Sequence, residues 1–462
     1  MSISKLALFG GKPIVQEHST LVGRWPTVTK KDLEDVVSAL EDHDFSGRNS
    51  FSVDVFERKL QQFLGIEYVS LFNSGTSALH GALTAVGVQP GDEVIVPAYT
   101  FLAPAMAALH LGAIPVFCDI DESTFNIQPE KIPDLITRKT KAIVVVHMHG
   151  LPADIPAIKK IAEVHGIKVI EDCAQSFGAM IGDKYCGTLG DISAFSFMSA
   201  KQLATCGELG GIATNDIDFR NRANLLKTYG EILGKHERVY NSYTLGYNYV
   251  ANPIQARFAQ NKLESFNEDI NPLLENARAL SEFILKKIPF LIPPYVPQSF
   301  KHVYHFFRVR VNGEVIGYKK NHLLRQAIMD IMKAEGLNLR FYQNTPVPGQ
   351  TIFQTLNANM NGYPWHMHAD KNERYKANYK IENYPNTLKT ISESFVVGGS
   401  GAAPLYFTNK ETIEYYMAGF DKISQNIGEV ISYANSLQNN YIDPWIGISK
   451  ISDTKGDFKI FT

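Results

Sequence analysis

The chain has 462 residues, of which 45% are hydrophobic and 20% are charged, so it can bury a large core and form two or three domains. Its 45 basic and 47 acidic residues leave a formal net charge of −2, which excludes a general electrostatic surface for nucleic acid or anionic membrane. No apolar run approaches the about 20 residues that cross a bilayer, and no signal-like segment opens the chain, so we expect a soluble cytoplasmic protein.

Residues 1–30 are predicted to form an N-terminal arm, and residues 31–250 a large domain. In the large domain, apolar strand patterns alternate with helical patterns, and strands are expected at about 68–72, 93–96, 116–120, 142–146 and 169–171. Buried strands that alternate with helices predict an α/β fold, with a mainly parallel sheet covered by helices on both faces. In such a sheet, ligands bind beyond the carboxyl ends of the strands.

The pattern changes to long helices after residue 250. Residues 251–288 are predicted to form bridging helices that lead to a smaller C-terminal α+β domain over residues 289–462. The alternating run His305–Val311 predicts a strand in that domain. Residues from about 349 to 385 are rich in Asn, Tyr and His and lack a clean period, so we expect a long loop or excursion, of a kind that is often functional.

One lysine, Lys201, follows an apolar strand-like segment and precedes a glycine-rich loop. Its amine should therefore lie at a strand end with little side-chain bulk around it. Desolvation or a neighbouring cation lowers the pKa of such an amine and lets it condense with an aldehyde. The alternative, from this segment alone, is an ordinary lysine in a surface loop.

Two other segments carry groups that complement this lysine. Asp172 ends the apolar strand that begins at Val169, and residues 68–79 read as a strand, a small-residue turn and a helix start. Backbone N–H groups at such a turn, together with the helix dipole, form a ready phosphate site. A phosphate cradle, a carboxylate and a lysine are the three contacts that pyridoxal 5'-phosphate requires.

Taken together, these segments resemble the fold-type I, pyridoxal-phosphate-dependent sugar aminotransferases of the DegT/DnrJ/StrS type, over roughly residues 5 to 435. The opening Leu6–Pro13 also resembles the branch that acts on cyclitols and related rings. The resemblance implies a fold-type I architecture with a small C-terminal domain and pyridoxal phosphate as cofactor. The matching motifs occur in the order Asn73–Leu79, Val96–Phe101, Glu171–Gln175, Phe195–Lys201 and Gly246–Tyr249.

The resemblance also implies a role for individual residues. Lys201 would form the Schiff base with the cofactor and shuttle a proton, and Asp172 would face the pyridine nitrogen. Asn248 would reach the phosphate of the neighbouring subunit's cofactor, which implies a homodimer with the active site at the interface. The remaining implied contacts are Gly75, Thr76, Ser77 and Ser196 at the phosphate, with Phe101 and Gln175 at the ring. Several implied roles have a structural alternative. Gly75–Ser77 and Asp172 could instead cap helices. Phe101 could pack in the core, and Asn248 could be a turn residue.

The chain departs from the family pattern at Val250, where relatives commonly carry an arginine that can contact a substrate or donor carboxylate. An apolar side chain cannot replace that planar donor, so another cation must hold the carboxylate, and the candidates are Arg308, Arg310 and Arg340. Lys201 itself is retained, which favours amino transfer over the dehydration carried out by related enzymes with histidine at this position.

Histidines alternate at His147 and His149 and again at His366 and His368, a spacing that can bind zinc. No third or fourth ligand lies at a useful spacing, so we expect no metal site. The four cysteines are scattered without metal-ligand spacing, which favours reduced thiols.

The leading hypothesis is an aminotransferase that moves an amino group from glutamate or glutamine to a ketone or aldehyde of a sugar, nucleotide-sugar or cyclitol. Its partners would be a small-molecule amino donor and carbonyl acceptor, without nucleic acid or membrane. Two alternatives remain open. One is the same chemistry on a non-sugar carbonyl in natural-product biosynthesis, and the other is a non-catalytic regulatory protein that holds the cofactor.

Overall fold

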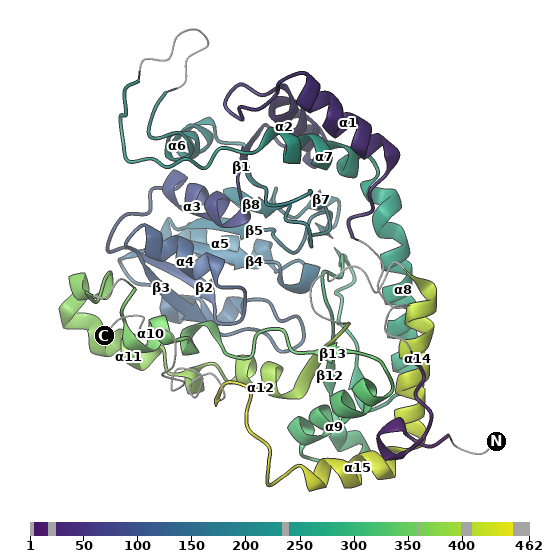
Figure 1. Ribbon diagram of the computed structural model, residues 1–462. Coiled ribbons are helices and arrows are strands. Elements are labelled where there is room, and N and C mark those ends of the chain that lie inside the picture. Colours follow the sequence, from purple (N-terminus) through teal and green to yellow (C-terminus); the bar gives the residue numbers. More distant parts are fainter. Residues whose placement is uncertain (1–3, 17–24, 233–239, 359–360, 399–408, 447–462) are drawn as a thin grey trace, which may run out of the picture.

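The computed structural model of the chain describes residues 4–16, 25–232, 240–358, 361–398 and 409–446. A central sheet has the strand order β1-β9-β8-β5-β4-β2-β3 (Figure 1). From β3 to β8 the neighbouring strands are parallel, whereas β9 runs antiparallel to both β8 and β1. The predicted α/β fold with a mainly parallel sheet is therefore confirmed. The strands are β1 (Tyr68–Phe72), β2 (Glu93–Pro97), β3 (Ile114–Cys118), β4 (Thr140–Val146), β5 (Lys168–Asp172), β8 (Ile192–Ser196) and β9 (Gly210–Thr214).

Helices cover both faces of this sheet. Successive residues of β4 face opposite sides of the sheet: Val144 packs toward α3 and α4, and Val145 packs toward α5. Because both sides are covered, the strand is continuously apolar. The helices on the first face are α3 (Gly75–Ala85), α4 (Ala103–His110) and α6 (Ile217–Lys227); those on the second are α2 (Phe51–Leu64), α5 (Ile155–His165) and α7 (Pro253–Glu264). The remaining helix of this part, α1 (Lys30–Glu41), starts at a capping box formed by Thr29 and Asp32.

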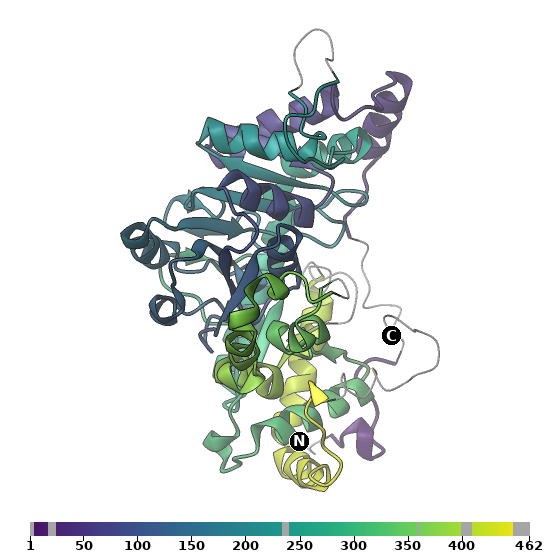
Figure 2. The ribbon, with the colours of Figure 1, turned by 90° about the vertical axis from the view of Figure 1, so that its left-hand side faces the viewer.

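The long helix α8 (Phe266–Lys287) leads away from this part and lies beside α14 (Lys410–Gln425) (Figures 1 and 2). A second, antiparallel sheet follows, with the strand order β10-β12-β14-β13, and it shares a core with α8, α9 (Asn321–Ala334), α14 and α15 (Ile427–Ser436). Its strands are β10 (Leu291–Ile292), β12 (Phe307–Val311), β13 (Leu339–Arg340) and β14 (Ser394–Val397).

The first residues of the arm also pack on this second core. Leu6 and Val15 are buried there, and the Glu335 carboxylate accepts the backbone N–H groups of Ala7 (2.8 Å) and Ile14 (3.2 Å). Part of the predicted arm, residues 399–408 and the tail beyond residue 446 lie outside the described residues. Within the described ranges, no helix is long and apolar enough to cross a membrane.

The segment from 349 to 385 differs from the expected loop. Its described residues form α10 (Thr351–Thr355), α11 (Asn372–Asn378) and short 3-10 turns, and they lie beside β3 (Figure 1). Trp365 and Tyr379 are fully buried in the same core as α3 and α4, and the Tyr379 hydroxyl donates to the Pro115 carbonyl. Aromatic packing without a helical period therefore builds this segment into the core.

The remaining elements are short. A small antiparallel sheet has the order β11-β6-β7, and α12 (Pro385–Glu393) precedes β14. The strands of that small sheet are β6 (Met180–Ile181), β7 (Lys184–Tyr185) and β11 (Phe300–Lys301). The 3-10 helices are Ala7–Phe9, Pro129–Lys131, Pro133–Leu135, Met148–Gly150, Gly313–Ile316, Val347–Gly349, Trp365–Lys371 and Ile381–Asn383.

Candidate active site

A cavity of about 330 Å³ lies at the carboxyl ends of β5 and β8 and at the start of α3. This is the position at which open parallel sheets bind ligands. Seven of the nine predicted cofactor residues line it, and Ser77 and Asn248 do not. The seven are Gly75, Thr76, Phe101, Asp172, Gln175, Ser196 and Lys201.

Lys201 and Asp172 share this cavity and influence each other electrostatically. Burial lowers the pKa of the Lys201 amine, and the carboxylates of Asp172 and Glu208 oppose that shift. Burial likewise raises the pKa of Asp172. A hydrogen bond of 2.9 Å from the Ala174 N–H and the charge of Lys201 both act to lower it. The amine and the acid therefore lie in one water-poor space.

Both backbone groups of Lys201 are held. Its N–H donates to the Met198 carbonyl (2.8 Å), and its carbonyl accepts the indole N–H of Trp25 (2.9 Å). Trp25 comes from the N-terminal arm, far away in the sequence, so no local signal near Lys201 could have predicted this contact. The lysine backbone is thus fixed at the edge of the cavity.

The predicted phosphate cradle is formed by the first turn of α3 and the end of β8. A Cβ atom added to Gly75 would lie 2.7 Å from the Ser196 Cβ, so only glycine allows this close approach. Gly210 of β9 pairs with Phe72 on one side and with Ser196 on the other, which sets the spacing between the two strand ends. The first N–H groups of a helix have no partner within the helix, so those of Gly75 and Thr76 can bind an anion.

Ser77 has a different position from the one predicted. Its hydroxyl accepts the backbone N–H of Ser74 (3.1 Å) and donates to the Asn73 side chain (2.7 Å), and it is buried. Ser74 instead lines the cavity, although its hydroxyl also accepts the Ser77 N–H to complete a capping box. The two serines are three residues apart, as in a capping box, although the second position more often carries glutamate or glutamine.

Residues from the C-terminal part of the chain form one wall of the cavity, where the sequence indicates a carboxylate-binding arginine but not the contact of Tyr342. Tyr342 lies there, and its hydroxyl accepts a hydrogen bond of 3.0 Å from the Gln175 amide. Burial raises the pKa of Tyr342 to about 12, so the phenol remains neutral. His305 lies on the same wall, and burial and the charge of Lys201 hold the pKa of its imidazole well below the ordinary value. No motif marks Tyr342, whereas the sequence leaves two interpretations for His305, a substrate contact or core packing.

Of the three candidate arginines, the structure brings Arg340 to the cavity. Its guanidinium carbon lies 4.7 Å from the centre of the Phe306 ring, which also lines the cavity. Arg308 is buried in the wall instead and donates to the Tyr99 hydroxyl (2.5 Å). Arg310 does not line the cavity.

Asn248 is exposed and lies beside the outermost strand, β1, rather than in the cavity. The carbonyl of the next residue, Tyr249, accepts the N–H of Asn73 (2.9 Å), and Val250 forms a bridge with Phe72. The rings of Tyr247 and Tyr249 stack on each other at 4.9 Å, on the side of His80. Because successive residues of an extended segment alternate, Asn248 points to the opposite side.

The buried group around His147 does not form an open metal site. The side chains of His147, Glu171 and Cys173 bring their ligand atoms within 4.8 Å of one another. However, His147 contacts Glu171 (2.9 Å) through one ring nitrogen and accepts the Ala153 N–H (3.0 Å) through the other. The Glu171 carboxylate also accepts three backbone N–H groups, from Gly187, Leu189 and Gly190. These groups stabilise the strand ends next to Asp172.

The cavity fits pyridoxal 5'-phosphate by the chemistry of its walls. A helix N-terminus with hydroxyl groups matches the phosphate, and Asp172 and Lys201 match the ring nitrogen and the aldehyde. The ring of Phe101, 59% exposed, supplies an aromatic surface. The buried Thr100 hydroxyl also lines the cavity and has no hydrogen-bond partner among the described residues, so it is available to a ligand.

Comparison with known proteins agrees with this geometry. Residues 26–369 match the model of the DegT/DnrJ/EryC1/StrS aminotransferase family. A UDP-N-acetyl-3-dehydro-alpha-D-glucosamine 3-aminotransferase from Acidithiobacillus ferrooxidans is 36% identical over 280 residues, which cover 60% of this chain and 69% of that protein.

Two solved structures are similar along most of the chain. The 3-amino-5-hydroxybenzoic acid synthase has a TM-score of 0.73 and 26% identity, covering 88% of this chain and 99% of that one. NtdA from Bacillus subtilis, solved with bound cofactor PMP, has a TM-score of 0.69 and 25% identity, covering 89% and 84%. These comparisons agree with the expected fold-type I architecture.

Proposed function

The chain belongs to the DegT/DnrJ/EryC1/StrS aminotransferase family, and we propose that it moves an amino group from glutamate or glutamine to a keto or aldehyde group of a sugar, nucleotide-sugar or cyclitol. The family establishes a pyridoxal-phosphate-dependent aminotransferase. The observation that carries the proposal is the single cavity that holds Lys201, Asp172 and the helix start at Gly75. The 3-aminotransferase from Acidithiobacillus ferrooxidans supports a sugar-type acceptor.

Each residue of the cavity has a proposed task. The bound cofactor would supply an aldehyde that takes up the amino group and a ring that stores electrons. Lys201 Nζ, with its lowered pKa, would hold that aldehyde and later move a proton to and from the reacting carbon. Asp172 would hold the proton on the ring nitrogen. Gly75, Thr76 and the Ser196 hydroxyl would bind the phosphate, while Phe101 and Gln175 would orient the ring.

We assign the donor carboxylate to Arg340. This residue lines the same cavity as Lys201, and its planar guanidinium can bind a carboxylate through two hydrogen bonds. The contact of Arg340 with the Phe306 ring limits the number of conformations that its side chain can adopt. Arg340 would thus replace the arginine that relatives carry at the position of Val250.

The proposed assembly is a homodimer in which Asn248 of one subunit reaches the cofactor phosphate of the other. This proposal is supported by the exposure of Asn248 and of apolar side chains near it in the sequence, such as Tyr243 (61% exposed) and Leu245 (75% exposed). Exposed apolar side chains of this size are common at protein interfaces. We also propose that the protein acts in the cytoplasm.

A second candidate is amino transfer to a non-sugar carbonyl in natural-product or antibiotic biosynthesis. It is favoured by the similarity to 3-amino-5-hydroxybenzoic acid synthase, whose name denotes an aromatic product. It uses the same residues for amino transfer and differs only in the acceptor. The two candidates would bind different acceptors against the cavity wall that contains His305, Phe306 and Tyr342.

The test begins with purified protein loaded with pyridoxal phosphate, whose visible absorbance is followed while single amino acids are added. Glutamate or glutamine should change the spectrum, and the Lys201→Ala variant should not respond. The matched control is Lys168→Ala, which removes a partly exposed lysine of β5. Unchanged donor turnover in Lys201→Ala would overturn the assignment. Sugar and non-sugar carbonyl acceptors, supplied with one donor, then separate the two candidates.

A further inference from the structure

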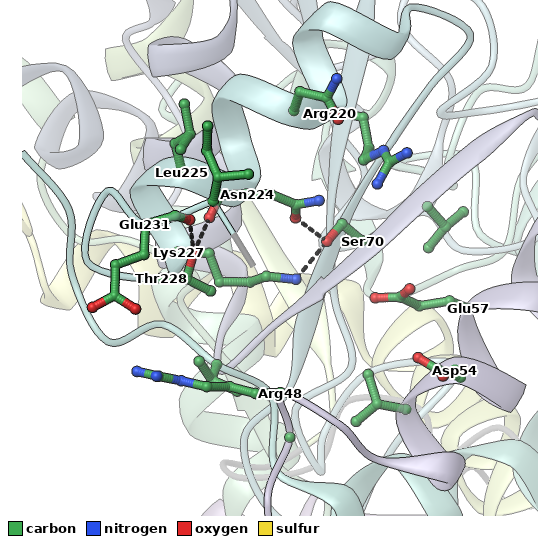
Figure 3. A pocket seen from close by; sticks show the side chains of 16 residues that line it. Arg48, Asp54, Glu57, Ser70, Arg220, Asn224, Leu225, Lys227, Thr228 and Glu231 are labelled. Carbon is green, nitrogen blue, oxygen red and sulfur yellow. Dashed lines mark hydrogen bonds between the residues drawn. The ribbon is translucent and has the colours of Figure 1, made fainter. Parts of the chain in front are cut away.

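A second cavity, of about 510 Å³, lies between α2, α6 and the outer edge of β1. It is lined by charged side chains of both signs, among them Glu57 from α2 and Lys227 from α6. Figure 3 shows these two side chains reaching toward β1 from opposite sides, with Ser70 between them. None of these residues belongs to the cavity that holds Lys201.

Glu57 and Lys227 bind the backbone of the same residue, Leu71. The Glu57 carboxylate accepts the Leu71 N–H (2.7 Å), and the Lys227 ammonium donates to the Leu71 carbonyl (3.2 Å) and to the Ser70 hydroxyl (2.6 Å). The Ser70 hydroxyl in turn donates to the Asn224 side chain (2.6 Å). Because β1 is the outermost strand, two opposite charges take the place of a neighbouring strand at this point.

This arrangement is a costly way to stabilise a strand. Burial raises the pKa of Glu57 and lowers the pKa of Lys227, and in each case the charge of the other residue opposes the shift. Both side chains are half-buried. Opposite charges that are withdrawn from water often add little stability beyond what apolar packing would provide, although removal of only one is damaging. Their value here is that they fix the position of the Leu71 peptide.

Leu71 connects directly to the groups proposed to bind the cofactor. Two residues after it, the N–H of Asn73 donates to the Tyr249 carbonyl (2.9 Å), and the helix start at Gly75 follows. The backbone carbonyl of Lys227 accepts the N–H of Tyr249 (3.0 Å). Lys227 therefore holds the cradle strand with its side chain and, with its backbone, the segment that displays Asn248.

We propose that Glu57 and Lys227 are positioning residues that keep the phosphate cradle of one subunit and the Asn248 segment in a fixed relative position. Cofactor affinity and subunit association then depend on the same pair of charges. This inference rests on the proposed function, because it assigns the cradle at Gly75 and the partner contact of Asn248 to the cofactor phosphate.

The experiment compares Glu57→Gln and Lys227→Met with a control at a buried ion pair, Asp32 and Lys262. The ammonium of Lys262 lies 2.8 Å from the Asp32 carboxylate, and this pair joins α1 to α7. For each variant, apo-protein is titrated with pyridoxal phosphate to obtain the dissociation constant, and subunit association is measured by sedimentation. The midpoint of thermal unfolding is measured in parallel.

Glu57→Gln and Lys227→Met should weaken cofactor binding by about 10-fold or more, the effect of losing one hydrogen bond to the charged phosphate, and should also weaken association. The double variant Asp32→Asn/Lys262→Met should lower the unfolding midpoint while cofactor affinity stays unchanged. The inference is overturned if the Glu57 and Lys227 variants lose only thermal stability, as the control does. If Lys227→Met does not fold, Glu57→Gln, which keeps the side-chain shape, decides the question. Failure of the unmodified protein to bind the cofactor would instead refute the proposed function.

Discussion

Replacement of Gly75 by alanine tests the phosphate cradle with the smallest possible change. Gly75 is the first residue of α3, outside the left-handed region, so alanine suits its backbone conformation. The added Cβ would lie 2.7 Å from the Ser196 Cβ and 3.2 Å from its Oγ. Because carbon atoms normally stand about 3.5–4.0 Å apart, helix start and strand end must separate by roughly 1 Å.

The magnitude of the effect follows from this displacement. Overpacking of this kind costs about 1–3 kcal/mol of stability, partly offset by the better helix propensity of alanine. A hydrogen bond to a charged group contributes about 1.5–3 kcal/mol, so the loss of one such bond to the phosphate lowers affinity roughly 10- to 150-fold. Cofactor binding should therefore suffer more than folding does.

The assay is a titration of apo-protein with pyridoxal phosphate, followed by visible absorbance, together with thermal unfolding. Gly428→Ala in α15 is the matched control, because no atom lies within 4 Å of the added Cβ. The control should bind the cofactor normally and be slightly more stable. If Gly75→Ala binds the cofactor as tightly as the control, the junction of α3 and β8 is not the phosphate site.

Three further changes test other parts of the structure. Trp25→Phe keeps an aromatic ring but removes the hydrogen bond to the Lys201 carbonyl, so cofactor capture, timed by absorbance, should slow severalfold while the unfolding midpoint changes little. Trp365→Ala empties a fully buried site and should cost about 3–5 kcal/mol in urea unfolding, and a cost below about 1 kcal/mol would contradict its core position. Burial raises the pKa of Asp32, but hydrogen bonds, led by the one from Lys262, lower it by more, so the pKa lies below its ordinary value of 3.8. The stability that Asp32 adds is therefore present above that value and lost as pH falls below it, and Asp32→Asn should show a smaller drop in its urea midpoint between about pH 5 and pH 3.

The parts of the fold that could be predicted are those in which short segments carry the information. The strand that ends at Asp172 is one of several short apolar segments that alternate with helical patterns, and this alternation indicates a covered parallel sheet. The order of strand ends then predicts that Asp172, Gly75 and Lys201 meet at one edge. The structure brings these three residues to one cavity.

The parts that could not be predicted depend on contacts between distant segments. Tyr342 reaches the cavity only because the C-terminal part of the chain folds back against the large domain, and no local pattern encodes that approach. Trp365 lies in a segment without periodicity, so its burial follows from aromatic packing against the sheet core rather than from a helical face. Composition alone does not separate the roles of Ser74 and Ser77, because phosphate cradles and helix caps use the same residue types.

The paired strands around Gly210 have a consequence for how this enzyme could change its substrate. Gly210 pairs with Phe72 at the end of β1, which leads to the phosphate cradle, and with Ser196 at the end of β8, which leads to Lys201. A substitution of Gly210 would therefore disturb cofactor binding and proton transfer at once. The opposite wall, with Phe306 and Tyr342, comes from a separate stretch of the chain. Libraries directed at new acceptors should vary that wall, except at Arg340, and leave the glycine untouched.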